Sequence, residues 1–538
     1  MPSFFKRKKQ EKNSQEQSNN RFLEPIDYSL SANLEIIKQK TGKSSDLVIR
    51  TLKIGNHSEI KTAIVYFEGI VDTQFINDFI IESMTMNRDL QEKLIRKNAL
   101  EIIAEEMVAV GKVKTVSDWD ELFLSLMSGE TIILVDGINE ALSASTKGGE
   151  KRAVQDPSTQ ISVRGSREGF TENIQTNTAM VRRIIKNPDL WLESMTIGKI
   201  TKTDVAIMYI NEIAEEKIVE EVRERLKRID IDGILESGYI EQLIEDQTLT
   251  TFPTLYHTER PDIVAGNLLE GRVAIFVNGT PFVLLAPAVF IQFFQSVEDY
   301  YARFDIATAL RFLRILTLFI SLIGPAVYIA ATTFHQEMIP TQLLIAIAAQ
   351  REAVPFPAFV EAVIMEVSFE ILREAGIRLP KAVGSAVSIV GALVIGQAAV
   401  QAGIVSPAMV IVVAITAIAN FATPSFAIAI SARLIRFLFM ISAATFGFYG
   451  IILGIIMMTA HLCSLRSFGV PYMSPLAPFI PANAGDTFVR VPWWALRNRA
   501  RLIGDKNPIR EGKNQRPQPP EKRVMVNRDI EKGGRNES

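Results

Sequence analysis

The sequence predicts an α+β cytosolic region of two related α/β lobes, followed by an all-α multi-span membrane domain. The first 300 residues alternate β-rich and helix-forming stretches, and part of that pattern occurs twice. Residues 310–465 instead form long apolar segments, and a helix needs roughly 20 apolar residues to cross a bilayer. We therefore divide the 538 residues into a disordered arm (1–22), a first lobe (23–145), an inter-lobe segment (146–189), a second lobe (190–300), a membrane domain with about five apolar helices (301–465), a basic juxtamembrane segment (466–502) and a disordered tail (503–538).

The composition excludes several classes of protein. The net charge of −2 gives no sign of a nucleic-acid partner, and the single cysteine excludes an intrachain disulfide and a multi-cysteine metal site. The four histidines lack ligand spacing, so we expect no metal and no cofactor. No apolar stretch of a secretory signal follows the basic run at 6–9, so the N-terminal domain is expected to be cytoplasmic.

The first lobe begins as β structure. Residues 47–54 and 61–69 are rich in Val, Ile, Tyr and Phe and flank a turn at Gly55-Asn56, which predicts two strands. Helical segments are predicted at 73–84 and 90–110, and a short strand is predicted at 131–135.

Part of this lobe recurs later in the chain. Ala-Ile-Val-Tyr at 63–66 returns as Ala-Ile-Met-Tyr at 206–209, an offset of 143 residues, and 129–137 matches 271–279 with an offset of 142. Because the matches keep their order and spacing, we infer two related lobes. A cleft between the lobes would suit a ligand. The alternative is that duplication only built a larger scaffold.

The inter-lobe segment predicts a helix with basic residues. Apolar residues recur at helical spacing between 170 and 185, and the helix should end before Pro188. Its polar side, with Arg182 and Arg183, is predicted to be exposed. We regard it as either an anion or partner site or an inter-lobe helix with a solvated basic face. The candidate interaction motif comprises Arg164, Arg167, Glu168, Arg182 and Arg183.

The second lobe leads into the membrane boundary. Residues 273–277 and 281–285 predict strands around a tight turn at Asn278-Gly279. Residues 297–311 mix charges with aromatics, and Trp493-Trp494 lies beside arginines. Both compositions are typical of a membrane interface.

Five long apolar segments form the predicted membrane domain, at 310–334, 354–372, 383–404, 407–430 and 437–462. Basic residues lie before the first segment, after the second and, as Arg433 and Arg436, between the last two, which suits the cytoplasmic side if the glutamate-bearing segment 354–372 crosses the membrane. Five crossings would then place the basic tail outside. A cytoplasmic tail needs an even number of crossings, with 341–349 as half of a re-entrant hairpin. The sequence therefore leaves open whether the number of crossings is odd or even.

Polar residues inside these segments are the candidate pore or gating residues. Glu366 and Glu370 are four residues apart and share one helix face, whereas Glu361 lies nearly opposite. Such residues either pair between helices or line a path for cations or small solutes. The set comprises Glu361, Glu366, Glu370, Gln397, Gln401 and Asn420.

The sequence carries no usable enzyme motif. Gly42-Lys43-Ser44 has the end of a phosphate-binding loop, but position 37 is isoleucine where that motif needs glycine. GxGxxG after a strand, HExxH and GxSxG are absent from the sequence. We therefore expect that this protein is not an enzyme.

Longer motifs point to one family. They are 163–170 (Val-Arg-Gly-Ser-Arg-Glu-Gly-Phe), 176–179 with Arg182-Arg183, 258–262 (Thr-Glu-Arg-Pro-Asp), 267–271 with 278–282, 355–380 and 388–403. In this order they closely resemble the A subunit of GerA-type spore germinant receptors. The resemblance covers roughly residues 25–500 and is specific because several long stretches match.

The resemblance implies a multi-pass protein of the spore inner membrane, in contact with lipid. It implies a transporter-like B subunit that binds the nutrient and a lipoprotein C subunit as partners. It also implies homo-oligomers that act as a nutrient-gated cation channel and help to trigger germination. The alternatives are a small-solute transporter with a regulatory soluble domain, although the apolar segments show no inverted repeats, and a non-conducting receptor scaffold.

Overall fold

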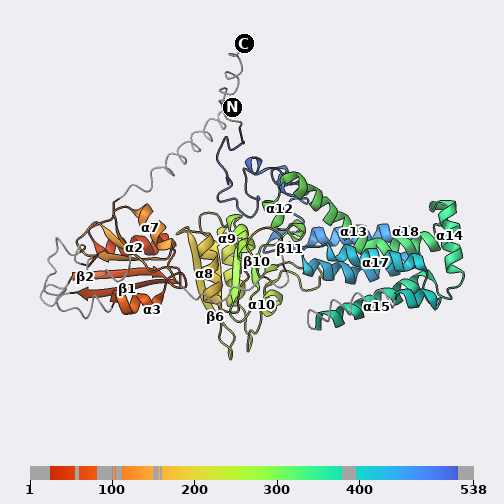
Figure 1. Cartoon of the computed structure of the whole chain (residues 1–538), viewed down its shortest axis with the longest axis horizontal. Coiled ribbons are helices and arrows are strands. Elements are labelled where there is room, and N and C mark those ends of the chain that lie inside the picture. Colours follow the sequence, from red (N-terminus) through yellow and green to blue (C-terminus); the bar gives the residue numbers. More distant parts are fainter. Residues whose placement is uncertain are drawn as a thin grey trace, which may run out of the picture.

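The computed structural model describes residues 25–54, 60–81, 100, 103–104, 112–148, 157, 160, 162–378 and 396–518, and the structural statements below refer to these residues. Figure 1 shows two β-sheet lobes followed along the long axis by a region of helices. The arm at 1–22, almost all of the helix predicted at 90–110 and most of the apolar segment at 383–404 lie outside the described residues.

The first lobe is built on a five-stranded antiparallel sheet with strand order β1-β2-β4-β5-β3. The strands predicted at 47–54, 61–69 and 131–135 correspond to β1, β2 and β4. The elements are α2 (Leu30–Lys40), β1 (Leu47–Ile54), β2 (Ile60–Phe67), α3 (Thr73–Phe75), the π-helix η1 (Ile76–Ile81), β3 (Val113–Val116), α7 (Trp119–Met127), β4 (Glu130–Val135) and β5 (Ala141–Ser145).

The second lobe repeats this architecture, with strand order β6-β7-β9-β10-β8 and antiparallel neighbours throughout. Each strand occupies the position of its counterpart in the first sheet, so the prediction of two related lobes is confirmed. The elements are α8 (Ile174–Ile184), β6 (Leu190–Ile197), β7 (Thr203–Ile210), α9 (Glu216–Lys227), α10 (Ser237–Ile244), β8 (Tyr256–Thr258), α11 (Pro261–Leu269), β9 (Val273–Val277) and β10 (Val283–Ala286).

The turns that follow β4 and β9 show why the repeat is visible in the sequence. Gly137 after β4 has φ of 86°, and Gly279 after β9 has φ of 93°. Only glycine adopts this left-handed region without steric cost, so both copies need glycine there. The strands before these turns are rich in Val and Ile and almost entirely buried, which suits the centre of a sheet.

The C-terminal region consists mainly of helices. Its hydrophobic core lies between α13, α15, α17 and α18. The elements are the 3₁₀-helix η3 (Phe290–Phe294), α12 (Glu298–Tyr301), α13 (Phe304–Thr333), η4 (Gln336–Met338), α14 (Thr341–Arg351), α15 (Ala358–Arg378), α17 (Pro407–Phe421), α18 (Phe426–Ser464), β11 (Arg466–Ser467), β12 (Val470–Pro471), η5 (Pro481–Asp486) and η6 (Trp493–Ala495).

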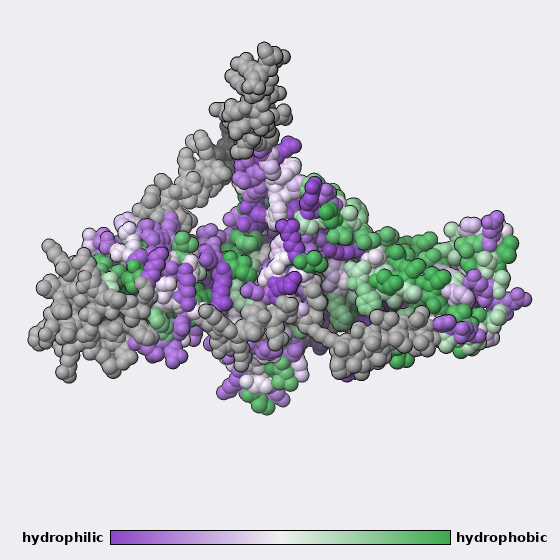
Figure 2. Space-filling model, viewed as in Figure 1, coloured by the Kyte–Doolittle hydropathy of each residue, from purple (hydrophilic) through white to green (hydrophobic). Residues whose placement is uncertain are grey.

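Two of the described helices, α13 and α18, are long and apolar enough to cross a membrane. The shorter helix α17 is also apolar. Figure 2 shows that hydrophobic residues cover much of the visible face of the helical region, whereas the lobes carry more hydrophilic residues there. The sequence prediction of an apolar helical region after an α/β region therefore agrees with the structure.

Helix α18 is folded into a hairpin at Gly447. The backbone is non-helical there, with φ of 61°. A Cβ atom on Gly450 would lie 2.3 Å from the carbonyl oxygen of Ser442, and one on Gly454 would lie 2.7 Å from the ring of Phe439. Residues eight and fifteen positions apart cannot touch within a straight helix. The segments 426–446 and 448–464 therefore run in opposite directions.

This hairpin corrects the predicted boundaries of the last two apolar segments. The sequence places them at 407–430 and 437–462, separated by Arg433 and Arg436. In the structure the chain breaks at 422–425 and again at Gly447. Arg433 and Arg436 instead lie within the first half of α18. Basic residues inside an apolar stretch look like a boundary in the sequence, but a buried partner can hold them inside a helix.

The chain beyond α18 returns to the second lobe. Leu465, Phe468 and Tyr472 belong to the hydrophobic core of that lobe, and the Tyr472 hydroxyl donates to the Pro253 carbonyl at 2.7 Å. Ile503, in the tail predicted to be disordered, is also buried in this core. The structure differs from the prediction here, because 503–510 contacts the lobe through Ile503, Lys506 and Arg510 although its composition is polar.

Replacement of Gly447 by alanine is expected to lower the free energy of unfolding by about 2 kcal/mol or more. The added Cβ would meet His335 Cε1 at 2.7 Å in addition to the strain of a positive φ. Gly469→Ala is the matched control, since Gly469 has φ of 78° but open space around it. Thermal unfolding in detergent measures the stability of both variants. Equal losses of stability in Gly447→Ala and Gly469→Ala would contradict a packed hairpin turn.

Candidate functional site

Glu366 on α15 and Arg436 on α18 form a buried ion pair, with 2.5 Å between Oε2 and Nη1. Arg436 also donates to Ser321 on α13, to the carbonyl oxygen at 2.6 Å and to Oγ at 3.0 Å. A buried charge is tolerated when it is both paired and hydrogen-bonded. These contacts therefore join three helices at one buried point.

One helical turn along α15, Glu370 accepts from two arginines. Arg433 Nη1 lies 2.7 Å from Oε2, and Arg373 Nη1 lies 3.4 Å from Oε1. The guanidinium of Arg373 also lies 5.1 Å from the ring centroid of Phe421, at the end of α17. Glu370 thus forms a second link between α15 and α18, one helical turn away from the first.

Asn420 on α17 completes this group of contacts. With its amide oriented to satisfy its neighbours, Asn420 donates to Ser321 Oγ and to the Ala429 carbonyl and accepts from Arg373 Nη1, each at 3.2 Å. We call the whole group the ion-pair cluster. It comprises Glu366, Glu370, Arg373, Asn420, Arg433 and Arg436.

The charges of the ion-pair cluster change the chemistry that the sequence suggested. Three guanidinium groups stand against two carboxylates. Glu366 and Glu370 are therefore neutralised and do not form a free acidic lining in this conformation. Their geometry is that of a clamp between α15 and α18.

Glu361 lies apart from the cluster, as its place on the helix predicts. Its carboxylate is fully buried and pairs with Arg351 Nε at 3.3 Å. It also accepts from the backbone N–H of Ser406 at 2.8 Å, and Ser406 caps the N-terminus of α17. A carboxylate is favoured there because the helix dipole places positive charge at the N-terminus.

The two amides Gln397 and Gln401 lie outside the cluster and are exposed. They belong to the helical turn that precedes 405 and α17. The structure thus brings together three of the six predicted pore or gating residues, Glu366, Glu370 and Asn420, and separates the others.

Sequence reasoning missed the arginine partners of the glutamates. Arg433 and Arg436 are three residues apart, so they share a helix face, just as Glu366 and Glu370 do. Two oppositely charged pairs with helical spacing in separate apolar segments were a usable signal. This signal is ambiguous in the sequence, because arginine next to an apolar run also fits a membrane boundary.

Arg182 of the predicted interaction motif is buried, which corrects its assignment to an exposed face. Only 1% of its surface is accessible. It pairs with Asp46 of the first lobe, donates to the Leu190 carbonyl at 3.0 Å and covers the ring of Phe67 at 4.3 Å. Arg182 therefore fastens helix α8 to both lobes.

Arg183 is exposed and donates to the carbonyls of Gly69, at 3.4 Å, and Gly148, at 3.1 Å. The other three motif residues, Arg164, Arg167 and Glu168, are exposed in the preceding loop. The motif is thus divided between an inter-lobe contact and a solvated loop.

That loop is held by Arg260, which sequence reasoning did not single out. Its guanidinium donates to the Gln160 carbonyl at 3.1 Å, to Ser162 Oγ at 2.7 Å and to the Ser166 carbonyl at 2.9 Å. It also pairs with Asp262 at 2.7 Å. Arg260 therefore fixes the inter-lobe segment on α11.

A second set of buried charges connects the lobes to the helices. Arg311 on α13 pairs with Asp299 at 3.0 Å and with Asp486 at 3.0 Å, and Arg314 pairs with the same Asp299 at 2.8 Å. The Tyr300 hydroxyl donates to Asp486 at 2.9 Å. The start of α13 is thus tied to α12 and to the C-terminal segment.

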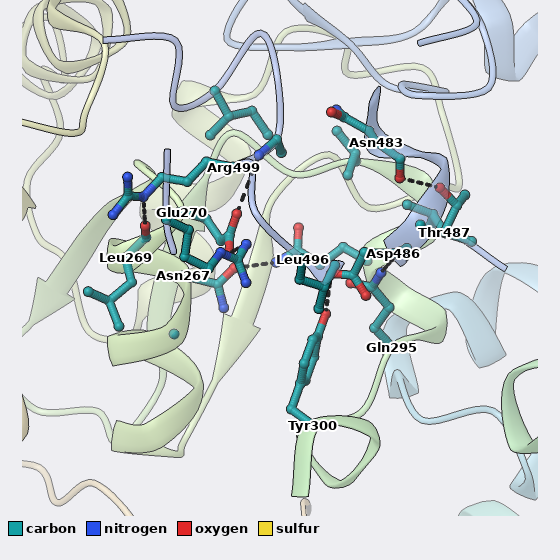
Figure 3. Close-up of a pocket in the computed structure, with 18 of the residues that line it drawn as sticks. Asn267, Leu269, Glu270, Gln295, Tyr300, Asn483, Asp486, Thr487, Leu496 and Arg499 are labelled. Carbon is teal, nitrogen blue, oxygen red and sulfur yellow. Dashed lines mark hydrogen bonds and ion pairs between the residues drawn. The ribbon is translucent and has the colours of Figure 1, made fainter. Parts of the chain in front are cut away.

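A cavity of about 570 Å³ lies beside these charges, between the second lobe and the C-terminal segment. Figure 3 shows Glu270 and Arg499 on one side of it and Tyr300 and Asp486 on the other. Across the described ranges, no group of three or more His, Cys, Asp or Glu side chains is arranged to hold a metal ion.

Comparison with known proteins identifies a family and several relatives of this chain. The family described as Bacillus/Clostridium GerA spore germination protein matches residues 35–502. Spore germination protein KA of Bacillus subtilis (strain 168) is 62% identical over 511 residues, which cover 95% of this chain and 93% of that protein. The uncharacterized membrane protein YfkQ of the same organism is 44% identical over 500 residues, which cover 93% of this chain and 96% of that protein.

The solved structures that are similar include the crystal structure of the N-terminal domain of the A subunit of the Bacillus megaterium spore germinant receptor GerK3. It is 56% identical and covers 51% of this chain and 100% of that chain, with a TM-score of 0.42. The family match and the relatives agree with the resemblance that the sequence motifs carry. This chain therefore belongs to the GerA family of spore germination proteins, the family of the A subunits of GerA-type germinant receptors.

Proposed function

We propose that this chain is the membrane-spanning A subunit of a germinant receptor and acts in spore germination. Its helical region crosses the inner membrane of the spore, with both lobes on the cytoplasmic side. The names of its relatives and the apolar helices support this proposal.

The path of the chain favours an even number of crossings. Helix α13 starts beside the second lobe, where Arg311 is tied to Asp299. The second half of α18 returns to that lobe, because Leu462 and Leu465 lie in its core. Both ends of the helical region are thus on the same side. A cytoplasmic lobe then implies a cytoplasmic C-terminal segment.

Two faces of the helical region differ in chemistry. The exposed residues of α17 and of the first half of α18 are largely apolar, which suits lipid. By contrast, the exposed amides Gln397 and Gln401 lie one helical turn apart on the helix that precedes α17. Amides facing lipid would leave their polar groups without partners. They instead fit a contact with another subunit or with water.

This difference carries the mechanistic proposal. Several copies assemble with the helical turn at 396–401 toward a common axis, and nutrient binding opens a path for monovalent cations along it. The ion-pair cluster holds each subunit together during this change. A transporter-like B subunit binds the nutrient and a lipoprotein C subunit completes the receptor. The contacts of Arg311 with Asp299 and Asp486 connect the lobes to α13.

The test is cation flux through the receptor, reconstituted with its B and C subunits in liposomes. The double variant Gln397→Leu, Gln401→Leu is expected to reduce nutrient-dependent potassium flux at least several-fold, because it removes polar groups from the proposed lining. Thr445→Leu is the matched control, since Thr445 is an exposed polar residue on the lipid-facing helix α18.

One outcome would contradict the proposed lining, and two would contradict the channel. Equal flux in both variants would remove the two amides from the pathway. Saturable uptake with counterflow of a small solute would indicate a transporter. An intact complex without any flux would indicate a receptor scaffold.

A further inference from the structure

The cavity between the second lobe and the C-terminal segment contains a buried arginine that forms no ion pair with a described residue. Arg272 is 6% exposed and lines the cavity. Its Nη1 donates to two neutral oxygens, the Pro287 carbonyl at 2.7 Å and Gln292 Oε1. Its Nε has no hydrogen-bond partner among the described residues. A buried guanidinium without an anion is energetically costly.

The carboxylates that line the cavity are already engaged by other arginines. Glu270 pairs with Arg510, Asp262 with Arg260, and Asp486 with Arg311. None of them lies within ion-pair distance of Arg272 among the described residues. Within the described part of the chain, no carboxylate therefore forms an ion pair with this guanidinium, and Glu270, which acts on Arg272 electrostatically, is held by Arg510.

Arg499, which also lines the cavity, likewise forms no ion pair with a described residue. Its guanidinium donates to the carbonyls of Leu269, Asn507 and Ile509 at 2.7–2.8 Å, which are neutral partners. Burial lowers the pKa of Arg499 and lowers that of Arg272 to about 10, and both side chains still carry a positive charge at neutral pH. The cavity is thus lined by two guanidinium groups that form no ion pair among the described residues.

The remaining lining is largely apolar and fits an organic molecule. A volume of about 570 Å³ falls within the range of small-molecule sites, which combine apolar walls with a few polar groups. Gln292 is held in place by Arg272 and by Asn267, to which its amide donates at 3.0 Å. The apolar lining residues include Ile263, Leu269, Val289, Ile291, Leu496 and Ile503.

We propose that this cavity binds a small organic carboxylate, with its charge on Arg272 and its apolar part against the walls. A carboxylate suits a guanidinium because two oxygens can accept from two N–H groups. The cavity is formed by the second lobe, the residues around α12 and the C-terminal segment. A bound ligand would therefore join these three parts, next to the charges that hold the start of α13.

The test uses the full chain purified in detergent, with benzoate as the probe. Benzoate is expected to raise the melting temperature saturably, whereas the neutral analogue benzyl alcohol is not. Arg272→Gln should weaken benzoate binding about tenfold or more in calorimetry, because a charged hydrogen bond is lost. Arg303→Gln, at an exposed arginine outside the cavity, should keep the wild-type affinity.

A second pair of variants tests the cavity itself. Gly266 lines the cavity on α11, and a Cβ there would meet no atom within 4 Å. Gly266→Leu should fill the space and abolish benzoate binding, whereas Gly266→Ala should keep it. Both remove a helical glycine, so they share the gain in helix propensity.

The results separate a binding role from a structural one. Without a ligand, Arg272→Gln should melt at the wild-type temperature or above it, since it removes an uncompensated charge. A lower melting temperature with unchanged benzoate binding would overturn the proposal. So would equal effects of benzoate and benzyl alcohol, or a response to inorganic phosphate but not to benzoate.

Discussion

Glu366→Gln is expected to lower the free energy of unfolding by about 3–5 kcal/mol, because removing one partner of a buried ion pair leaves the other charge uncompensated. Arg436 would keep Ser321 and the new amide oxygen as hydrogen-bond acceptors, but it would lose the negative charge that it pairs with. The cluster would then hold three guanidinium groups against the single carboxylate of Glu370. Thermal or detergent-induced unfolding of the purified chain measures the loss.

Two further variants make this prediction specific. The double variant Glu366→Gln, Arg436→Gln should recover much of the lost stability, since two neutral amides need no counter-charge. Arg378→Gln should cost less than about 1 kcal/mol, because its pair with Glu374 on the same helix is exposed. If Glu366→Gln were no more destabilising than Arg378→Gln, the buried clamp between α15 and α18 would be wrong.

Arg182→Leu is expected to lower the free energy of unfolding of the lobes by about 3–5 kcal/mol, because Asp46 would be left buried without its guanidinium partner. The contact of Arg182 with the ring of Phe67 would also be lost. The two lobes should then separate more readily. Urea unfolding gives the energy, and hydrogen exchange at 44–46 reports the opening between the lobes.

Arg183→Leu is the matched control for this second prediction. Arg183 is the next residue of α8 but is exposed, and it contacts only the carbonyls of Gly69 and Gly148. Arg183→Leu should lower the free energy of unfolding by less than about 1 kcal/mol. Equal exchange at 44–46 in both variants would show that Arg182 does not hold the lobes together.

The hairpin of α18 shows one limit of sequence reasoning. Residues 437–462 form one apolar stretch, and nothing in their hydropathy marks a reversal at Gly447. The turn depends on close packing of Gly450 against Ser442 and of Gly454 against Phe439. Small residues that permit close approach are visible in the sequence, but their partners are chosen by the packing of the helices.

The charged residues show a second limit. The spacing of Glu366 and Glu370 predicted a shared helix face, and the structure gives them shared partners on α18. The sequence also placed Arg182 beside Arg183 as one basic group. One of them is buried and the other exposed, because the inter-lobe contact covers only one side of α8.

The sequence by itself determined the two related lobes, the apolar helical region after them and the family. These features depend on local patterns: β-branched runs, glycines at positive φ, long apolar segments and motifs in a fixed order. Only the tertiary structure decided that Arg436 neutralises Glu366, that α18 turns back at Gly447 and that 465–510 returns to the second lobe. The physical reason is that a charge or a small residue looks alike in many settings, and its role depends on which distant residue packs against it.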